Sequence, residues 1–303
     1  MVRKAIKAYP WFGGKYKFLK YYLALIGDCE RYYEPFMGSA SIFLNKAPSD
    51  AEFLSDVDSG LVNLMKCLSK LENLNRMIDI VANLDFDKKQ FEAAKKRIDI
   101  KEQSAVPDGT DVLWAADVYR SIVYSFNSLR KSYRFTENPF ANCDLYAVNE
   151  RLDGVSIEKK DAFLVLDEIK RDNVRNADNT VILLDPPYLE SLMNCKNVYA
   201  SGLTEMEQER LLLLIRDMKA RVILCGYRSE NDGNDFYDRV LREGNAKKGE
   251  RRWRCYHVAD AKPPSLKKNN TRILREFVWL NYDPLAYCPS VKSVMTLEES
   301  GWL

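Results

Sequence analysis

Residues 180–188 read TVILLDPPY, and this stretch decides the fold. Its run of apolar residues indicates a buried strand of the kind found in parallel sheets. Asp185 follows at once, where a carboxylate is costly unless a hydrogen-bond donor is offered to it. Pro186 and Pro187 carry no N–H, so they hold the backbone rigid and leave carbonyl oxygens as acceptors. The stretch predicts a strand that ends in a fixed corner of acceptors, with Tyr188 supplying an aromatic face.

Working outward, three more stretches read as strands that lead into turns or helices: Arg31–Phe36, Ala51–Asp56 and Ala220–Tyr227. Apolar residues at helical spacing follow the second strand, and Thr204 with Glu207 forms the sequence of a capping box before a further helix. Residues 235–244 read as another helix, and residues 273–282 as a closing strand. Strands that alternate with helices predict a doubly wound α/β fold with a mostly parallel sheet.

The segment of residues 73–158 does not share this rhythm, because it is mainly helical and charged. We interpret it as an inserted lobe. The expected organisation is a main domain of residues 1–72 and 159–303, interrupted by the lobe of residues 73–158.

Composition excludes several classes of protein. No apolar run in the 303 residues approaches the roughly 18 that a membrane helix needs. The amino-terminal residues, broken by Pro10, Gly13 and Gly14, lack the apolar centre of a secretion signal. We therefore expect a cytoplasmic protein without a membrane partner. The seven cysteines form no CxxC pair and His257 is the one histidine, so neither a metal site nor a disulfide framework is indicated.

A basic segment stands out against the net charge of +2. The segment from Lys247 to Arg275 contains ten Lys and Arg residues but only two acidic residues, Glu250 and Asp260. Such a run is either a solvated face or a surface for phosphates.

Two features lie where ligands of open α/β sheets bind, beyond the carboxyl ends of the strands. Residues 37–41, MGSAS, form a turn of small residues that leads into an expected helix, either as a simple strand–helix connection or as a close approach to a ligand. Asp56 ends the next strand, where a carboxylate serves as a helix N-cap or accepts from both hydroxyls of a ribose. The turn follows one strand and the acid ends the next, and this arrangement is typical of sites that hold nucleoside cofactors.

The corner at residues 185–188 suits an exocyclic amine on an aromatic ring. Such an amine is a poor nucleophile because its lone pair is delocalised into the ring. Two acceptors that take hydrogen bonds from the amine favour a tetrahedral, more nucleophilic nitrogen. Asp185 and a proline carbonyl supply these two acceptors.

Four segments in chain order resemble the Dam-type, alpha-class DNA adenine methyltransferases: WFGGK at Trp11–Lys15, EPFMGSASIFLN at Glu34–Asn45, LSDVDSGLVNL at Leu54–Leu64 and DPPY at Asp185–Tyr188. Residues 124–140, 201–215 and 274–282 resemble that family's target-recognition segment, the stretch after its catalytic motif and its final strand. The resemblance covers most of the chain. It implies a Rossmann-like S-adenosylmethionine-dependent methyltransferase sheet, with residues 73–158 as the inserted, mainly helical target-recognition domain.

The resemblance also implies roles for individual residues. S-adenosylmethionine would be the methyl donor, with no metal, and its site would comprise Trp11, Lys15, Phe36, Gly38, Asp56 and Asp185. The Lys15 ammonium would meet the methionine carboxylate, and Asp56 would hold the ribose. The catalytic motif would be Asp185, Pro186, Pro187 and Tyr188, with Tyr188 stacked on a flipped adenine.

Double-stranded DNA is the implied partner, and no obligate protein partner is evident. In the expected lobe the candidates for DNA contact are Asn127, Arg130, Lys131, Tyr133 and Arg134, whose groups suit bases and phosphates. The basic segment is interpreted as a loop around the DNA backbone, with Arg251, Arg252 and Arg254 as contacts. An ordinary polar surface is the alternative for both sets.

One residue departs from the family pattern, since Ala40 stands where that turn usually has a second glycine. A methyl group is tolerated there if the backbone has an ordinary negative φ, but it would crowd a close approach of the cofactor.

The predicted function is transfer of a methyl group from S-adenosylmethionine to the adenine-N6 amine of a flipped base at a specific site in duplex DNA, in a prokaryotic or phage-infected cell. Transfer to the cytosine-N4 amine or to adenine in RNA uses the same chemistry and is the near alternative. A catalytically silent nucleic-acid-binding module is the alternative of another class, and Ala40 is the feature that favours it.

Overall fold

The computed structural model describes residues 4–83, 86–103, 109–172, 177–188, 202–227, 236–242, 253–261, 274–293 and 299–302. The chain forms two compact units. Unit 1 comprises residues 1–17, 37–46 and 53–161, and unit 2 comprises residues 18–36, 47–52 and 162–303.

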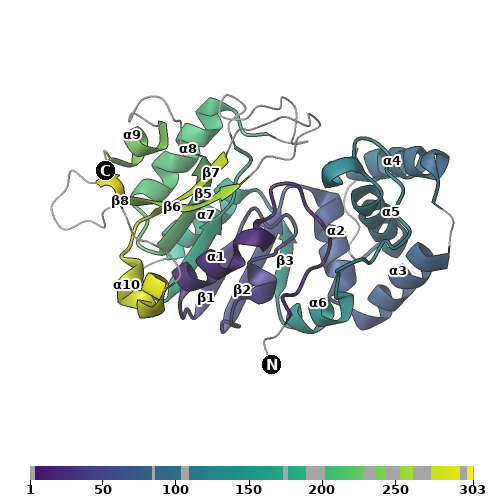
Figure 1. Ribbon diagram of the computed structural model, residues 1–303, viewed down its shortest axis with the longest axis horizontal. Coiled ribbons are helices and arrows are strands. Elements are labelled where there is room, and N and C mark those ends of the chain that lie inside the picture. The colour runs from purple at the N-terminus through teal and green to yellow at the C-terminus, as the bar shows by residue number, and fades with distance from the viewer. Residues whose placement is uncertain are drawn as a thin grey trace. The chain divides into compact units, whose positions relative to one another are not determined.

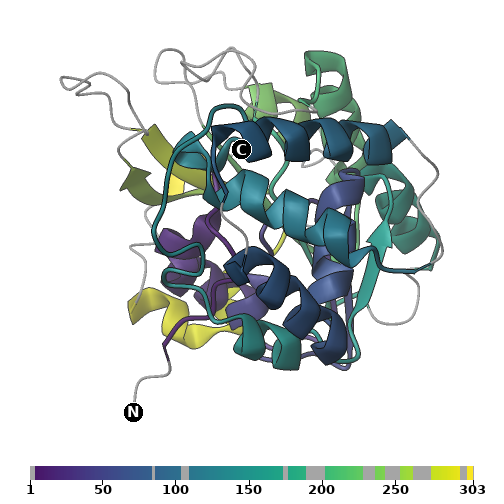
Figure 2. The same cartoon turned by 90° about the vertical axis from the view of Figure 1, so that its right-hand side faces the viewer.

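Unit 1 is built around helix α5, Val112–Val123. Figure 2 shows α5 between α3, Leu71–Asn83, and α4, Lys88–Gln103. Its other elements are η2 (Phe43–Asn45), most of β2 (Ala51–Asp56), α2 (Ser59–Leu68), η3 (Phe126–Ser128), α6 (Leu145–Arg151) and β3 (Ser156–Lys159), with η1 (Lys15–Phe18) at its boundary.

Two aspartates begin helices of unit 1. The Asp58 carboxylate accepts the Leu61 N–H at 3.0 Å at the start of α2. The Asp111 carboxylate accepts the Trp114 N–H at 3.0 Å at the start of α5. Each satisfies a backbone donor that the first turn of a helix leaves without a partner.

Unit 2 contains most of the strands (Figure 1). Its elements are α1 (Leu19–Ile26), β1 (Arg31–Glu34), α7 (Ala162–Asp172), β4 (Thr180–Leu184), α8 (Glu205–Arg216), β5 (Arg221–Tyr227), α9 (Phe236–Arg242), β6 (Arg254–Ala261), β7 (Leu274–Leu280), α10 (Pro284–Tyr287), η6 (Pro289–Ser293) and β8 (Glu299–Trp302). Helix α8 opens with the Thr204 and Glu207 capping box that its sequence predicts.

The sheet order is β3-β2-β1-β4-β5-β7-β6-β8, and β2 continues from unit 2 into unit 1. Within unit 2, β1, β4 and β5 are parallel, with Tyr32 opposite Val181 and Val181 opposite Arg221. Strand β7 runs antiparallel to β5 and places Glu276 opposite Tyr227. The parallel strands therefore end at one edge of the sheet, where β4 leads directly into Asp185.

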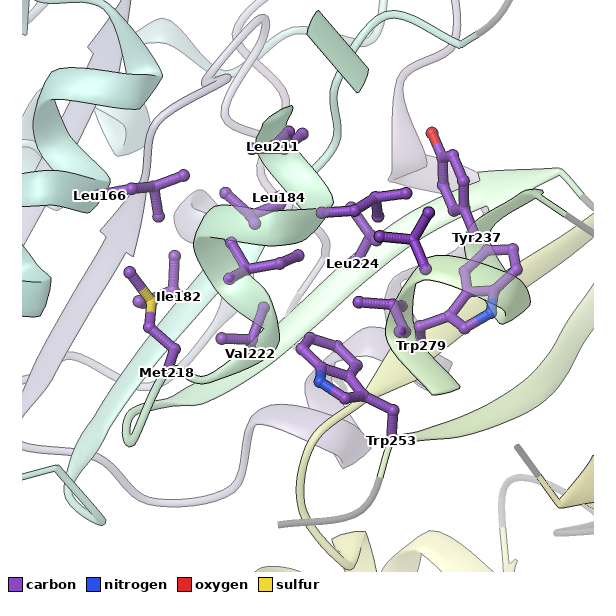
Figure 3. Close-up of a cluster of buried hydrophobic side chains, with 14 of the residues drawn as sticks. Leu166, Ile182, Leu184, Leu211, Met218, Val222, Leu224, Tyr237, Trp253 and Trp279 are labelled. Atoms are coloured by element: carbon purple, nitrogen blue, oxygen red, sulfur yellow. The ribbon is translucent and has the colours of Figure 1, made fainter. Parts of the chain in front are cut away.

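A large apolar cluster holds unit 2 together (Figure 3). Ile182 and Leu184 of β4 and Val222 and Leu224 of β5 point to the same face, because side chains alternate along a strand. Helices α7, α8 and α9 cover that face with Leu166, Leu211, Tyr237 and their neighbours. The cluster fixes β4 from one side and thereby positions the corner after it.

The predicted strands and the predicted α/β class are confirmed. Two local expectations are wrong, and one further strand was not predicted. The residues after the small-residue turn form a short 3-10 helix, η2, rather than an α-helix. Residues 254–261, expected in a loop, form β6, which pairs with β7. Residues 156–159 form β3, parallel to β2, which was not expected.

The described residues of 73–158 belong to the same compact unit as Trp11, Gly38 and Asp56 and do not form a unit of their own. The assignment of target recognition to this segment stays a prediction.

Candidate active site

The sequence-predicted site residues fall into two sets. Trp11, Lys15, Gly38 and Asp56 lie in unit 1, whereas Phe36 and residues 185–188 lie in unit 2. Phe36 is partly buried and packs against the large apolar cluster of unit 2. Its role beside a cofactor stays a prediction.

The unit 1 set is organised by a tight turn. Met37 donates its N–H to the Ser55 carbonyl of β2 at 3.0 Å, and the Ala40 N–H closes the turn on the Met37 carbonyl at 2.6 Å. Gly38 has φ +45°, and a Cβ at this position would lie 2.8 Å from Trp11 Nε1. Glycine is therefore required both by the backbone conformation and by the indole packed against it.

Asp56 ties the turn to the end of β2. Its Oδ2 accepts the Gly38 N–H at 3.1 Å, and its Oδ1 accepts the Asp58 N–H at 3.0 Å. Burial raises the pKa of Asp56 to about 6, although the backbone N–H groups pull the pKa the other way. Val57 supplies a third backbone N–H to this carboxylate. The backbone therefore fixes Asp56, and its role toward a ribose stays a prediction.

The WFGGK segment forms the wall next to the turn. Tyr9, which the sequence analysis did not single out, donates its hydroxyl to the Gly38 carbonyl at 2.8 Å. Its ring meets Trp11 edge-on at 6.1 Å between centroids. Lys15 is buried, with its Nζ donating to the Gly13 carbonyl at 3.1 Å. The role of Lys15 toward the carboxylate of a cofactor stays a prediction.

Ala40 does not have the negative φ that would make its methyl group harmless. Its φ is +49°, in the left-handed region, and the residue is 1% exposed. The left-handed conformation costs an alanine about 1 kcal/mol relative to its preferred conformations. The turn therefore keeps the shape that glycine would give it, at a cost in stability.

The unit 2 set is the corner after β4. The Pro187 carbonyl accepts Gln208 Nε2 of α8 at 2.6 Å, and the Gln208 Oε1 in turn accepts the Tyr237 hydroxyl at 2.7 Å. Gln208 is fully buried, so its amide fixes the corner against α8 and α9. One of the two proline carbonyls thus has a structural donor, and the role of Pro186 toward an amine stays a prediction.

Tyr188 connects the corner to β7. Its hydroxyl lies 3.0 Å from Asp185 Oδ1 and 3.1 Å from Glu276 Oε1. The ring is 4% exposed and meets Tyr227 edge-on at 4.5 Å between centroids. Burial, followed by the nearby Asp185 and Glu276, raises the pKa of Tyr188 well above its usual value, so the hydroxyl keeps its proton. Stacking on a flipped base would require one face of the Tyr188 ring to become accessible. The stacking role of Tyr188 stays a prediction.

Sequence reasoning missed Glu276, Tyr22 and Gln208. Glu276 is 2% exposed and also accepts the Tyr22 hydroxyl of α1 at 2.7 Å. The signal that could have found it is an acid inside the apolar strand sequence LREFVWL, which is costly without donors. Gln208 lies among many polar residues of α8, and Tyr22 is an ordinary aromatic residue of the mostly apolar α1, so no comparable signal marks either of them.

The candidate DNA-binding residues of unit 1 differ in their surroundings. Arg130 is engaged in ion pairs, with Asp58 at 2.8 Å and Glu102 at 3.3 Å. Tyr133 donates its hydroxyl to the Phe86 carbonyl at 2.9 Å and stacks parallel to Tyr124. These contacts give both side chains a structural role within the unit.

The remaining three, Asn127, Lys131 and Arg134, are exposed. Asn127 has φ +52°, a conformation that asparagine tolerates better than most residues. The proposed DNA contacts of all five residues stay predictions.

Much of the basic segment, including Arg251 and Arg252, lies outside the described residues. Arg254 lies in β6 and pairs with Asp283 at 3.2 Å. Trp253 is buried and donates to the Arg216 carbonyl at 2.9 Å, so it packs into unit 2. His257 lies 2.8 Å from Asp260.

Within the described ranges, no group of three or more His, Cys, Asp or Glu side chains is arranged to hold a metal ion. In the same part of the chain, no helix combines the length and the apolar character needed to cross a bilayer.

The strand order, the small-residue turn with its acid and the proline corner define a Rossmann-like methyltransferase fold. The family model of D12 class N6 adenine-specific DNA methyltransferases matches residues 11–251. The chain belongs to this family, and it is therefore a DNA methyltransferase of the adenine-N6 type. Among curated proteins the chain has no match.

Proposed function

We propose that the protein transfers a methyl group from S-adenosylmethionine to the N6 amine of an adenine that is flipped out of duplex DNA. The observation that carries the proposal is the position of Asp185. It follows β4 directly at the carboxyl edge of the parallel strands, in a chain of the adenine-N6 family. This edge is where open α/β sheets bind their ligands.

The residues of unit 1 fit the nucleoside part of the cofactor. Asp56 is held by backbone N–H groups at the end of β2, and its carboxylate there suits the ribose hydroxyls as donors. Trp11 lines the turn, and the buried Lys15 ammonium suits the methionine carboxylate. The cofactor supplies an electrophilic methyl group on a sulfonium.

The residues of unit 2 act on the amine. Asp185 accepts one N6 hydrogen, and the Pro186 carbonyl accepts the other, so the nitrogen lone pair is drawn out of the ring. The chemistry then depends mainly on positioning, because well-aligned groups can account for about 7–11 kcal/mol of a barrier. Extrusion of the base costs a few kcal/mol, which hydrogen bonds and aromatic contact in the pocket offset.

The test is transfer of a labelled methyl group from S-adenosylmethionine to mixed-sequence duplex DNA, followed by analysis of the product nucleosides. Asp185→Asn, which preserves the shape of the side chain, should lower the rate of transfer by roughly a hundredfold to a thousandfold. Asp217→Asn, at an exposed position after α8, is the matched control and should transfer normally.

The outcomes separate the alternatives. Label in N6-methyladenine with wild type and with Asp217→Asn, and far less with Asp185→Asn, supports the proposal. Label in N4-methylcytosine, or label that is found only when RNA replaces the DNA, overturns the choice of substrate. Calorimetry that finds salt-sensitive DNA binding without any cofactor binding identifies a silent module instead.

A further inference from the structure

A buried network of hydroxyls and carboxylates lies behind the corner in unit 2. Glu276 accepts from Tyr22 at 2.7 Å and from Tyr188 at 3.1 Å, and Tyr188 also reaches Asp185 at 3.0 Å. Tyr22, Tyr188 and Glu276 are each at most 4% exposed. Cys225 lies beside Tyr22 in the same network.

The protons of this network can be counted. Burial raises the pKa of both Tyr22 and Tyr188 well above the usual value, so each hydroxyl carries one proton. The Tyr22 proton is directed at Glu276. The Tyr188 proton lies within hydrogen-bond reach of two carboxylates, Asp185 and Glu276, and can serve only one of them fully at a time.

This sharing matters when an amine arrives. Each carboxylate oxygen has two lone pairs, so Asp185 can accept from the amine while Tyr188 stays bonded, but its charge is then shared between two donors and the bond from Tyr188 weakens. A buried hydroxyl left without an acceptor costs about 1–3 kcal/mol. Glu276 removes that cost, because it is already in place as a second acceptor for Tyr188.

The backbone around Glu276 is suited to this role. Strand β7 lies beside β5 in the sheet (Figure 1). Their antiparallel pairing places Glu276 opposite Tyr227, whose ring contacts the Tyr188 ring. The Gln208 amide fixes the Pro187 carbonyl on the other side of the corner. The Tyr188 hydroxyl, which also reaches Glu276, lies within hydrogen-bond distance of the Asp185 carboxylate.

We infer that Glu276 is a positioning residue for methyl transfer, which holds the Tyr188 hydroxyl so that Asp185 is oriented before the amine binds and is released to accept from it. The inference rests on the proposed function. It assigns to Glu276 no contact with the substrate.

The experiment compares variants of the full chain by their rate of methyl transfer in a single turnover at saturating DNA and cofactor. Tyr188→Phe removes one hydroxyl and keeps the ring. Glu276→Met keeps the length of the side chain and removes both acceptors, and Glu276→Gln keeps an acceptor oxygen. Tyr22→Phe is the matched control, because it removes the other hydroxyl from Glu276 without touching Asp185.

Tyr188→Phe and Glu276→Met should each lower the rate about tenfold, and the double variant should also lose about tenfold rather than about a hundredfold, because both act through one hydroxyl. Glu276→Gln should recover most of the rate, and Tyr22→Phe should remain within about threefold of wild type. Cofactor binding measured by calorimetry should be unchanged in all of them.

Additive losses in the double variant, or an unchanged rate in Glu276→Met, would overturn the inference. If Glu276→Met does not fold, the comparison of Tyr188→Phe with Tyr22→Phe decides, and equal rates for these two variants refute the role. A wild-type protein that transfers no methyl group to DNA refutes the proposed function instead, so the two failures are distinguishable.

Discussion

Asp56 in unit 1 and Asp185 in unit 2 are both aspartates at the carboxyl ends of parallel strands, but they are held in different ways. Asp56 accepts from the backbone N–H groups of Gly38 and Asp58. Asp185 accepts from the hydroxyl of Tyr188, which has a second acceptor in Glu276. One carboxylate is fixed by the backbone, and the other by a side chain that can change partners.

The difference matches the work that each group would do. A ribose makes the same hydrogen bonds before and during a reaction, so a carboxylate fixed by the backbone suits it. An amine changes its geometry and charge as it is methylated, and interactions that strengthen only then raise the rate. A carboxylate whose present donor can move to another acceptor suits that second task.

The largest effects are expected from substitutions of the two aspartates, one of which should reduce cofactor affinity and the other the rate of transfer. Asp56→Asn should weaken cofactor binding roughly 10–100-fold, because hydrogen bonds to a charged acceptor contribute about 1.5–3 kcal/mol. Asp185→Asn should lower the rate of transfer by roughly a hundredfold to a thousandfold and leave cofactor binding unchanged. Calorimetry and single-turnover kinetics measure the two quantities. If both variants lose affinity and rate in the same proportion, the two aspartates do not have separate tasks.

Lowering the pH should weaken cofactor binding through the protonation of Asp56. Asp56 has a pKa of about 6 in the folded protein, raised from 3.8 by burial, so lowering the pH through 6 protonates it. A protonated carboxyl has less capacity to accept from two hydroxyls, and cofactor affinity should fall by about tenfold for each pH unit below 6. Titration calorimetry at pH 7.5 and pH 5 should therefore differ by about tenfold.

The control for this pH dependence is Asp56→Asn, whose affinity should be lower but flat over the same range. The protein's own stability responds in the opposite sense. Since the folded pKa exceeds the unfolded one, the contribution of Asp56 to stability is largest below pH 3.8 and is lost as the pH rises through about 6.

A smaller effect is expected from Arg130, which pairs with Asp58 at 2.8 Å, while the Asp58 N–H donates to Asp56 at 3.0 Å. Arg130→Gln should weaken cofactor binding about fivefold, since a partly buried ion pair contributes about 1 kcal/mol. Lys131→Gln, at the exposed neighbouring position, should leave cofactor binding unchanged. Equal cofactor affinities in the two variants would contradict an effect of Arg130 on the cofactor site.

The smallest effect concerns the turn that holds Asp56. Ala40→Gly relieves the left-handed alanine, worth about 1 kcal/mol, but gives the unfolded chain more freedom, so the net gain in unfolding free energy should be roughly 0.5 kcal/mol. Thermal unfolding should shift upward by about 1–2 °C. Ala8→Gly is the matched control, because Ala8 is equally buried and is not among the residues with positive φ. It should lower the midpoint, and an equal change in both variants would contradict the assigned strain.

Local signals in the sequence predicted much of the fold. The apolar runs correctly marked β1, β2, β4, β5 and β7, and the Thr204 and Glu207 pattern correctly marked the start of α8. Strand β6 was missed because its basic and polar residues resemble a loop, whereas pairing with β7 makes it a strand. The ion pairs of Arg130 could not be predicted, because its two acidic partners lie far away in the chain.

By itself, the sequence determined the features that depend on neighbouring residues: the strand before Asp185, the rigid proline corner, the small-residue turn and the acid at the end of β2. Each follows from backbone preference and side-chain periodicity within a few positions. Only the tertiary structure decided what holds the two carboxylates. Tyr188 and Glu276 are 88 positions apart, and Arg130 and Asp58 are 72 apart, so their contacts depend on the order of strands and the packing of helices. The left-handed φ of Ala40 has the same origin, because the contacts around the turn fix its backbone against the preference of alanine.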